Sequence, residues 1–316
     1  MTGFVQSKIE LERDVQNELL NWKNKRHHTV LQIEGPWHVG KTHEVKKFVY
    51  SHYKQVVYVN LVRDEYGFED LMLTDHFMRE YCRNAGIGEY VDDESTVLVI
   101  DEIQERANVY NAIRDLREQL GCDIIVSGSY LARTVNSRDF FLPAGIAYLQ
   151  MYPLSFKEFC RALNIEDILE TISLKSESKD EDYQKLEEAY QVYRKIGGYP
   201  LVVTTFIESR QIDDCMVVFE DLIRTFTAES SRFFTNSTAL SIFQEAYKAV
   251  LVQIAEEKKG TGKTFLEFVT NFVKDTVKEP VSRNEVRTAA SWLLYSEIIG
   301  YCDLYNNGDV TDVVSN

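Results

Sequence analysis

The spacing of hydrophobic residues switches repeatedly between two patterns in the first half of the chain. Short runs of consecutive apolar residues predict strands at residues 29–34, 56–61, 97–100 and 123–127. Between these runs, apolar residues recur every three or four positions and predict helices at residues 8–26, 41–52, 68–82 and 106–120. Strands that alternate with helices of this length form a parallel sheet, and a continuous apolar run is typical of a strand covered on both faces. Residues 1–153 are therefore predicted to form an α/β domain with three layers, a parallel sheet between two layers of helices.

The alternation of strands and helices stops near residue 153. Ser155 and Glu158 have the spacing of a capping box, which predicts the start of a helix, and helical spacing continues to about residue 230. Residues 231–316 contain three helical stretches, a second capping box at Ser282 and Glu285, and a last apolar piece at 298–305. Three helices followed by a hairpin-like strand predict a winged-helix-like region at the end of the chain.

Composition excludes several classes of protein. The 316 residues carry 35 Lys and Arg against 50 Asp and Glu, a net charge of −15, and 44% of them are hydrophobic. Neither a disordered chain nor a fibrous repeat has this composition. A protein that neutralises many phosphates needs a basic face, so nucleic acid is a disfavoured partner.

The chain also lacks the patterns expected of an exported or membrane protein. No apolar run approaches the ~20 residues of a membrane span, and the N-terminus has no apolar signal-peptide core. The five cysteines lie far apart, without the spacing of a zinc or redox motif. We therefore expect a cytoplasmic protein with reduced thiols and no association with a membrane.

A phosphate-binding motif lies between the first predicted strand and the following helix. The sequence matches G-x-x-x-x-G-K-[ST] over Gly35, Pro36, Trp37, His38, Val39, Gly40, Lys41 and Thr42. The glycines let the backbone N–H groups turn inward at a helix N-terminus, where they bind anionic oxygens. Lys41 is predicted to reach the β- and γ-phosphates of a nucleotide, and the Thr42 hydroxyl to bind Mg²⁺. A chance match in a loop is the alternative, and the strand and helix on either side disfavour it.

Two carboxylates directly follow the strand at residues 97–100. We expect Asp101 to hold Mg²⁺ and Glu102 to activate the attacking water; the alternative is a core strand that ends in surface acids. Ser129, or less favourably Ser127, is the candidate sensor of the γ-phosphate, although Ser-Gly-Ser turns also occur without function. Because no Asn-Lys-x-Asp motif for guanine is present, ATP is preferred over GTP.

The chain resembles a group of bacterial and archaeal ATP-binding proteins of the AAA superfamily. The resemblance is carried by residues 35–42, 100–102, 127–129, 153–159 and 197–200, of which the Pro-Leu-Ser-Phe and Gly-Gly-Tyr-Pro stretches are the specific ones. It covers residues 8–305 and implies a P-loop NTPase core at 1–153, a helical lid at 154–230 and a winged helix at 231–316. It also implies a further nuclease-like domain, so the chain is expected to be either naturally short or truncated after Asn316.

One departure from the family pattern concerns an arginine. Members of the group often carry a basic residue where this chain has Ile146. An arginine that reaches the transition state can accelerate hydrolysis by about 10³–10⁵. We therefore expect slow hydrolysis by the isolated chain, or an arginine supplied by another copy of the chain or by a partner protein. Arg133 and Arg138 are the candidate substitutes within the chain, and two solvated loop arginines are the alternative interpretation.

Three functions follow from these patterns. The first is a Mg²⁺-dependent ATPase, with ATP or ADP bound, in which the nucleotide drives or gates the packing of the lid and winged helix against the core. The second is a regulatory or scaffold module that binds nucleotide and hydrolyses it negligibly, with Ile146 as the clue. The third is a DNA-handling protein that uses the helix at residues 282–294. Arg283 and Arg287 against Glu285 leave this helix one net positive charge, which favours a packing or subunit-contact role instead.

Overall fold

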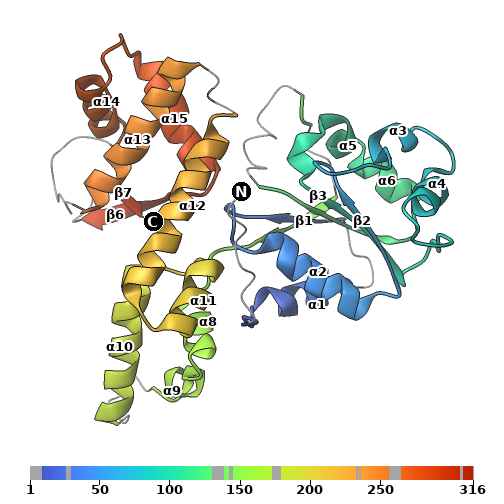
Figure 1. Cartoon of the computed structure of the whole chain (residues 1–316), viewed down its shortest axis with the longest axis horizontal. Coiled ribbons are helices and arrows are strands. Elements are labelled where there is room, and N and C mark those ends of the chain that lie inside the picture. Colours follow the sequence, from blue (N-terminus) through green and yellow to red (C-terminus); the bar gives the residue numbers. More distant parts are fainter. Residues whose placement is uncertain are drawn as a thin grey trace. The chain divides into compact units, whose positions relative to one another are not determined.

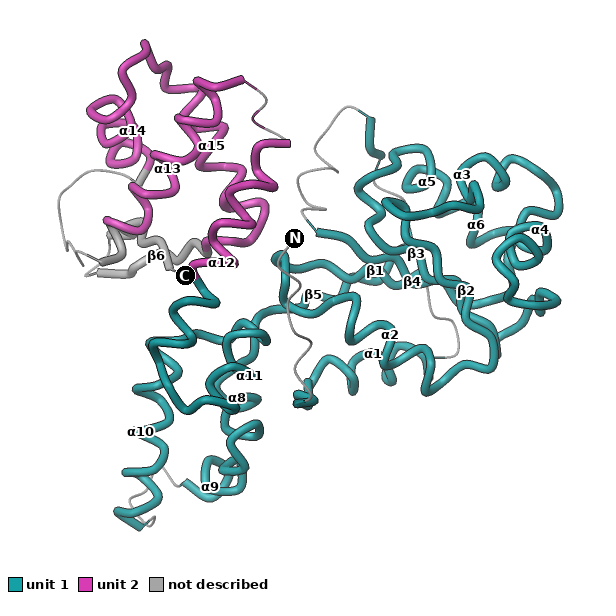
Figure 2. The backbone as a smooth tube through the Cα atoms, viewed as in Figure 1, with its two compact units in different colours: residues 1–219 teal, residues 220–316 magenta. Residues whose placement is uncertain are grey.

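The computed structural model divides the chain into two compact units, residues 1–219 and 220–316 (Figure 2). The predicted division into 1–153, 154–230 and 231–316 stays a prediction. The structure describes residues 9–25, 30–129, 139–141, 145–172, 179–232, 234, 236–255, 265–306 and 309–315.

The first unit is built around a five-stranded sheet whose strands are all parallel (Figure 1). Its strands are β1 (Val30–Glu34), β2 (Gln55–Asn60), β3 (Thr96–Asp101), β4 (Asp123–Ser127) and β5 (Ile146–Gln150). They lie in the order β2-β3-β4-β1-β5, so β4 separates the strand before the glycine-rich loop from the strand that ends in Asp101. The predicted parallel α/β sheet is confirmed, and β5 is a strand that the hydrophobic pattern did not predict.

Helices cover both faces of the sheet, as predicted (Figure 1). One face carries α1 (Val15–Lys23) and α2 (Lys41–His52). The other carries α3 (Phe68–Leu71), α4 (Phe77–Asn84), α5 (Ala107–Asn111) and α6 (Ile113–Gln119), with the 3₁₀ turn η1 (Ile103–Glu105) before α5. The helices expected at 68–82 and 106–120 are each split in two, and α1 begins seven residues later than the predicted start at residue 8.

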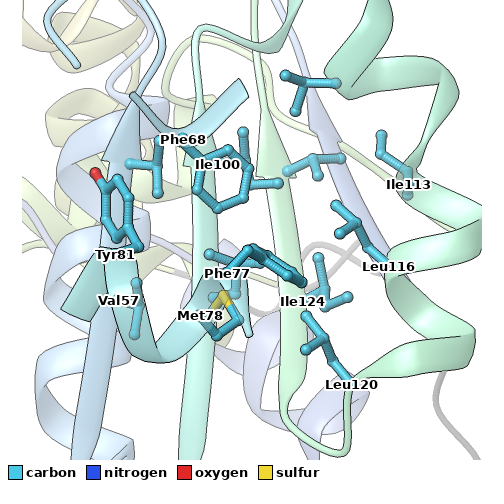
Figure 3. Packing of buried hydrophobic residues seen from close by; sticks show 14 of the residues in the cluster. Val57, Phe68, Phe77, Met78, Tyr81, Ile100, Ile113, Leu116, Leu120 and Ile124 are labelled. Atoms are coloured by element: carbon cyan, nitrogen blue, oxygen red, sulfur yellow. The ribbon is translucent and has the colours of Figure 1, made fainter. Parts of the chain in front are cut away.

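Alternating strand residues point to opposite faces of the sheet and fill two separate cores. Val57, Ile100 and Ile124 pack with Met78 and Leu116 of the helices on one face (Figure 3). The neighbouring strand residues Val97, Val99 and Ile125 belong to the cluster on the α2 face. Because β3 is buried on both faces, its end is held rigidly, which positions Asp101 and Glu102.

A helical region follows β5 within the first unit and continues into the second. It consists of α8 (Phe156–Ala162), α9 (Glu166–Thr171), α10 (Asp180–Ile196), α11 (Pro200–Ser209) and α12 (Ile212–Ser230). The predicted capping box opens α8: the Glu158 N–H donates to Ser155 Oγ at 3.2 Å, and the Ser155 N–H donates to Glu158 Oε2 at 2.8 Å.

A close backbone contact fixes the turn before α11. The Leu154 N–H donates to the Gly198 carbonyl at 2.7 Å, and a Cβ on Gly198 would lie 2.1 Å from the Leu154 carbonyl oxygen.

We expect Gly198→Ala to destabilise the protein by about 2 kcal/mol or more, because the side chain would push the two segments apart. Thermal unfolding should show this as a lower Tm. Gly67→Asn is the control, since Gly67 has a left-handed backbone with open space around it, and a Gly198→Ala protein as stable as that control would contradict the prediction.

The second unit contains three helices and then an antiparallel hairpin. These are α13 (Ser237–Ala255), α14 (Phe265–Thr276), α15 (Arg283–Tyr295), β6 (Gly300–Asn306) and β7 (Asp309–Ser315). Trp292 of α15 packs against Phe226, Phe234 and Phe243, and the second capping box opens α15 as predicted. The order of elements agrees with the predicted winged-helix-like region, whose identity stays a prediction. In the described part of the chain, no helix has the length and apolar character needed to span a bilayer.

Candidate functional site

The glycine-rich loop connects β1 to α2 and depends on the conformations of its two glycines. Gly35 has φ 150° and Gly40 has φ 94°, values that side chains rarely tolerate. A Cβ on Gly35 would also lie 2.0 Å from the carbonyl oxygen of Met151, because the chain after β5 passes directly against the loop. Gly40 is the N-cap of α2, so the loop ends at the first, positively polarised turn of a twelve-residue helix. Such a loop is suited to bind an anion.

Lys41, the first residue of α2, lies against the start of the loop. Its Nζ donates hydrogen bonds of 2.8 Å to the carbonyl oxygens of both Gly35 and Pro36. The side chain is almost completely buried. A buried ammonium group needs close anionic or polar partners, and the two carbonyl groups hold this positive charge at the start of the loop.

Asp101 is held by donors from four different positions. Its Oδ2 accepts from Thr42 Oγ1 at 2.9 Å and from the Tyr58 hydroxyl, and its Oδ1 accepts from Ser127 Oγ and from the Glu102 N–H. Burial, followed by the Asp101 charge, raises the pKa of Tyr58, so that hydroxyl stays protonated and donates. The structure thus brings together Thr42 and Asp101, the two predicted metal ligands.

Glu102 follows Asp101 with a left-handed backbone conformation, φ 57°. Its Oε2 accepts a 2.6 Å hydrogen bond from Gln104 Nε2. Burial raises the pKa of Glu102 and the Asp101 charge adds to this, against the opposing effects of Gln104 and Lys41. A carboxylate with a raised pKa is a stronger base, which suits the abstraction of a proton from water.

The other predicted loop and sensor residues differ in their surroundings. Pro36 and Val39 are buried, whereas His38 is exposed, has φ 63° and lies edge-on to Trp37 with ring centroids 3.7 Å apart. Ser129 is buried in the turn after β4. Ser127, the less favoured of the two candidate sensors, is the serine that contacts Asp101. The sensor role of Ser129 stays a prediction.

Several residues of the site were not identified from the sequence. Tyr58 looked like an ordinary strand residue, and Gln104 is the second residue after Glu102, without a motif of its own. Glu34 ends β1, and burial raises its pKa while Gln32 donates to it. One feature of the sequence could have pointed to this part of the site. The strand at residues 30–34 is apolar except for Gln32 and Glu34.

The structure corrects the interpretation of Ile146. Ile146 pairs with Val30 at the beginning of β1, whereas Gln150 pairs with Glu34 beside the loop. The four residue steps between them span about 13 Å, which is longer than an arginine side chain. A basic residue at position 146 would therefore not reach a phosphate at the loop of the same chain, and slow hydrolysis by the isolated chain stays a prediction. Arg133 and Arg138 lie outside the described residues.

The motif and its geometry agree with a known family. Residues 27–160 match the family model described as an AAA domain. The chain contains an AAA domain. The matched segment runs through all five strands and through the loop, Asp101 and Glu102, so the AAA domain includes every residue of the candidate site described above. The resemblance that the motifs indicated is confirmed.

Two similar proteins extend the comparison. An uncharacterized protein of Haemophilus influenzae is 29% identical over 110 residues, which are 35% of this chain and 24% of that protein. A solved Walker-type ATPase of Pyrococcus abyssi is 13% identical, with a TM-score of 0.57 over 97% of this chain and 94% of the other. The second likeness shows that this chain shares its fold with that protein.

Proposed function

We propose that the AAA domain binds ATP together with Mg²⁺ and hydrolyses it to ADP and phosphate. The observation that carries this proposal is the 2.9 Å hydrogen bond between Thr42, directly after the phosphate loop, and Asp101, at the end of β3. It connects two predicted parts of the site that lie 59 residues apart in the sequence, which supports the proposal. The buried Lys41 ammonium beside them supplies the charge that β- and γ-phosphates require.

The oxygen atoms of Thr42 and Asp101 fit a magnesium ion. Mg²⁺ prefers hard oxygen ligands and is usually bound by one or two protein groups together with phosphates and water. Asp101 is nearly fully buried and is oriented by Tyr58 and Ser127, so it presents its carboxylate in one position. When bound, the ion would neutralise charge on the phosphate oxygens.

Glu102 and Lys41 would act on the reacting groups. The Glu102 carboxylate accepts the proton of the attacking water, and Gln104 holds it in one orientation through its 2.6 Å hydrogen bond. Lys41 and the loop N–H groups bind the phosphates and stabilise the charge that develops in the transition state. The raised pKa of Glu102 supports its role as the base.

We also propose that the bound nucleotide changes the packing of the helical region after β5. Pro200 begins α11, and its Cγ lies 3.8 Å from the position that a Cβ on Gly40 would occupy. Tyr199 packs against the core cluster that contains Val39 and Met151. The phosphate loop and the start of α11 are therefore neighbours, so a nucleotide that moves the loop would also move this helix.

Binding and turnover of ATP by the full chain test the proposed function. We expect ATP and ADP to bind more tightly with Mg²⁺ than with EDTA, and phosphate release to require Mg²⁺. GTP should compete weakly, because no guanine-reading motif is present. A chain that binds ATP but releases no phosphate would instead support a regulatory module, and a chain that binds neither nucleotide would refute the proposal.

Tyr58→Phe should weaken the response to magnesium without preventing folding. The change removes one donor to Asp101 and keeps the ring over which Lys46 Nζ lies at 4.2 Å. Loss of one hydrogen bond to a charged group corresponds to about a tenfold effect, so the Mg²⁺ concentration for half-maximal ATP hydrolysis should rise by about that factor. Tyr50→Phe, at an exposed position of α2, is the control. Equal magnesium titrations of the two variants would remove Tyr58 from the site.

A further inference from the structure

Arg13 connects the phosphate loop to the first helix after the sheet. It lies just before α1, and its side chain is 4% exposed. Its Nη1 donates to the Val39 carbonyl at 3.2 Å, its Nη2 to the Tyr152 carbonyl at 2.7 Å and its Nε to Glu158 Oε1 at 2.9 Å. Arginine is rarely buried unless it is paired. Here a single guanidinium group bonds to three residues that lie 26, 139 and 145 positions away from Arg13 in the sequence.

The contact with Val39 bears directly on the geometry of the loop. An anion-binding loop turns its N–H groups inward, so its carbonyl groups need donors on the outside. In a planar trans peptide the C=O and the following N–H point in opposite directions, and the described chain contains no cis peptide bond. By holding the Val39 carbonyl, Arg13 therefore fixes the direction of the Gly40 N–H, immediately before Lys41.

The contact with Glu158 connects the same guanidinium group to α8. Glu158 Oε1 also accepts from the Asp14 N–H, and Oε2 accepts from the Ser155 N–H. Burial by itself raises the pKa of Glu158, but the two backbone N–H groups and Arg13 outweigh it and keep that pKa below its usual value. The pair is charged and fully partnered, so it holds α8 in one position relative to the loop.

We propose that Arg13 is a positioning residue for phosphate binding, which aligns the Val39 to Gly40 peptide while its pair with Glu158 holds the guanidinium group in place. This inference rests on the proposed function, because it requires a nucleotide at the loop. It predicts a residue outside the motif, 26 positions before Val39, that controls how well the motif binds.

Arg161 provides a matched control for this role. It also bonds α8 to the segment before α1, through the Glu12 carbonyl at 3.4 Å and Asp14 Oδ1 at 2.8 Å, and it pairs with Glu166 at 2.7 Å. These contacts dock the same two elements at a place away from the Val39 carbonyl. Loss of Arg161 should therefore reduce stability without misaligning the loop.

The test compares Arg13→Met, Arg13→Lys and Arg161→Met in the full chain. Calorimetry gives Kd for ADP and for AMP, which lacks the β-phosphate, and thermal unfolding shows that each variant folds. We expect Arg13→Met to weaken ADP binding by about 30-fold while AMP binding changes by less than about threefold. Arg13→Lys should weaken ADP binding by about tenfold, because an ammonium cannot span Val39 and Glu158 as the guanidinium does. Arg161→Met should stay within about twofold of the unaltered chain.

Folded Arg13 variants with unchanged ADP affinity would overturn the inference, as would an Arg161→Met protein that weakens ADP binding equally. Where Arg13→Met does not fold, Arg13→Lys decides by the same criterion, because it keeps the buried charge beside Glu158.

Lys41→Ala separates the failure of this inference from the failure of the proposed function. If Lys41→Ala loses ADP and the Arg13 variants do not, only the role of Arg13 fails. If Lys41→Ala and the unaltered chain bind ADP alike, the proposed function fails.

Discussion

Replacing Lys41 by alanine is expected to weaken ATP binding by about 100-fold. The lysine supplies the buried positive charge at the loop, and charge-assisted hydrogen bonds to phosphates contribute about 1.5–3 kcal/mol each. The substitution also removes the 2.8 Å bonds to the carbonyls of Gly35 and Pro36, which loosens the loop. Titration of the variant with ATP and Mg²⁺, followed by calorimetry or by a fluorescent nucleotide, measures the change.

Lys47→Ala is the matched control for this experiment. Lys47 lies on the same helix, α2, and its partner Glu10 is largely exposed, with Nζ and Oε1 2.7 Å apart. The control removes the same charge from the same element, so a general electrostatic effect would weaken both variants. We expect ATP affinity within about twofold of the unaltered chain, since exposed ion pairs contribute little. A Lys41→Ala variant that binds ATP as tightly as Lys47→Ala would exclude the phosphate loop as the nucleotide site.

Glu102→Gln should separate binding from chemistry. Glutamine has nearly the same shape as glutamate but cannot accept a proton from water, and general-base catalysis contributes about 10²–10⁴ in rate. ATP binding should stay within about threefold of the unaltered chain, since Lys41 and the loop are unchanged. Phosphate release should fall by at least about 100-fold. Single-turnover hydrolysis of radiolabelled ATP measures the chemical step directly.

Glu105→Gln controls for the loss of a negative charge near the site. Glu105 lies in the 3₁₀ turn after Glu102 and raises the pKa of Glu102 only as the last of several causes. Its substitution should change the rate of phosphate release by less than about threefold. If Glu102→Gln and Glu105→Gln hydrolyse ATP at similar rates, Glu102 is not the base, and another group activates the water.

The sequence predicted correctly those helix and strand ends that neighbouring residues determine. The helix at 41–52 has the bounds of α2, and the strand at 123–127 has those of β4, because a glycine-rich turn or polar residues mark their ends. Both capping boxes form as predicted, since the Ser and Glu of each box satisfy N–H groups within four residues of one another.

The predictions that failed depended on distant contacts or competing local bonds. The segment before Val15 is not helical, and there Arg13 and the Asp14 N–H bond to Glu158, about 145 residues away. The helix expected at 68–82 breaks after Leu71, where Thr74 bonds to the Leu71 carbonyl through both its N–H and its hydroxyl. Threonine side chains compete in this way with helical hydrogen bonds.

The sequence by itself determined the phosphate loop, the two carboxylates after β3 and the α/β class, since each follows from neighbouring residues or from periodicity. Tertiary structure alone decided that β5 joins the sheet beside β1, that Tyr58 and Ser127 hold Asp101, and that Arg13 reaches Val39. The physical reason is that hydrophobic periodicity records which face of an element is buried. It does not record which element buries that face, because any strand of similar apolar character could occupy the same place in the sheet.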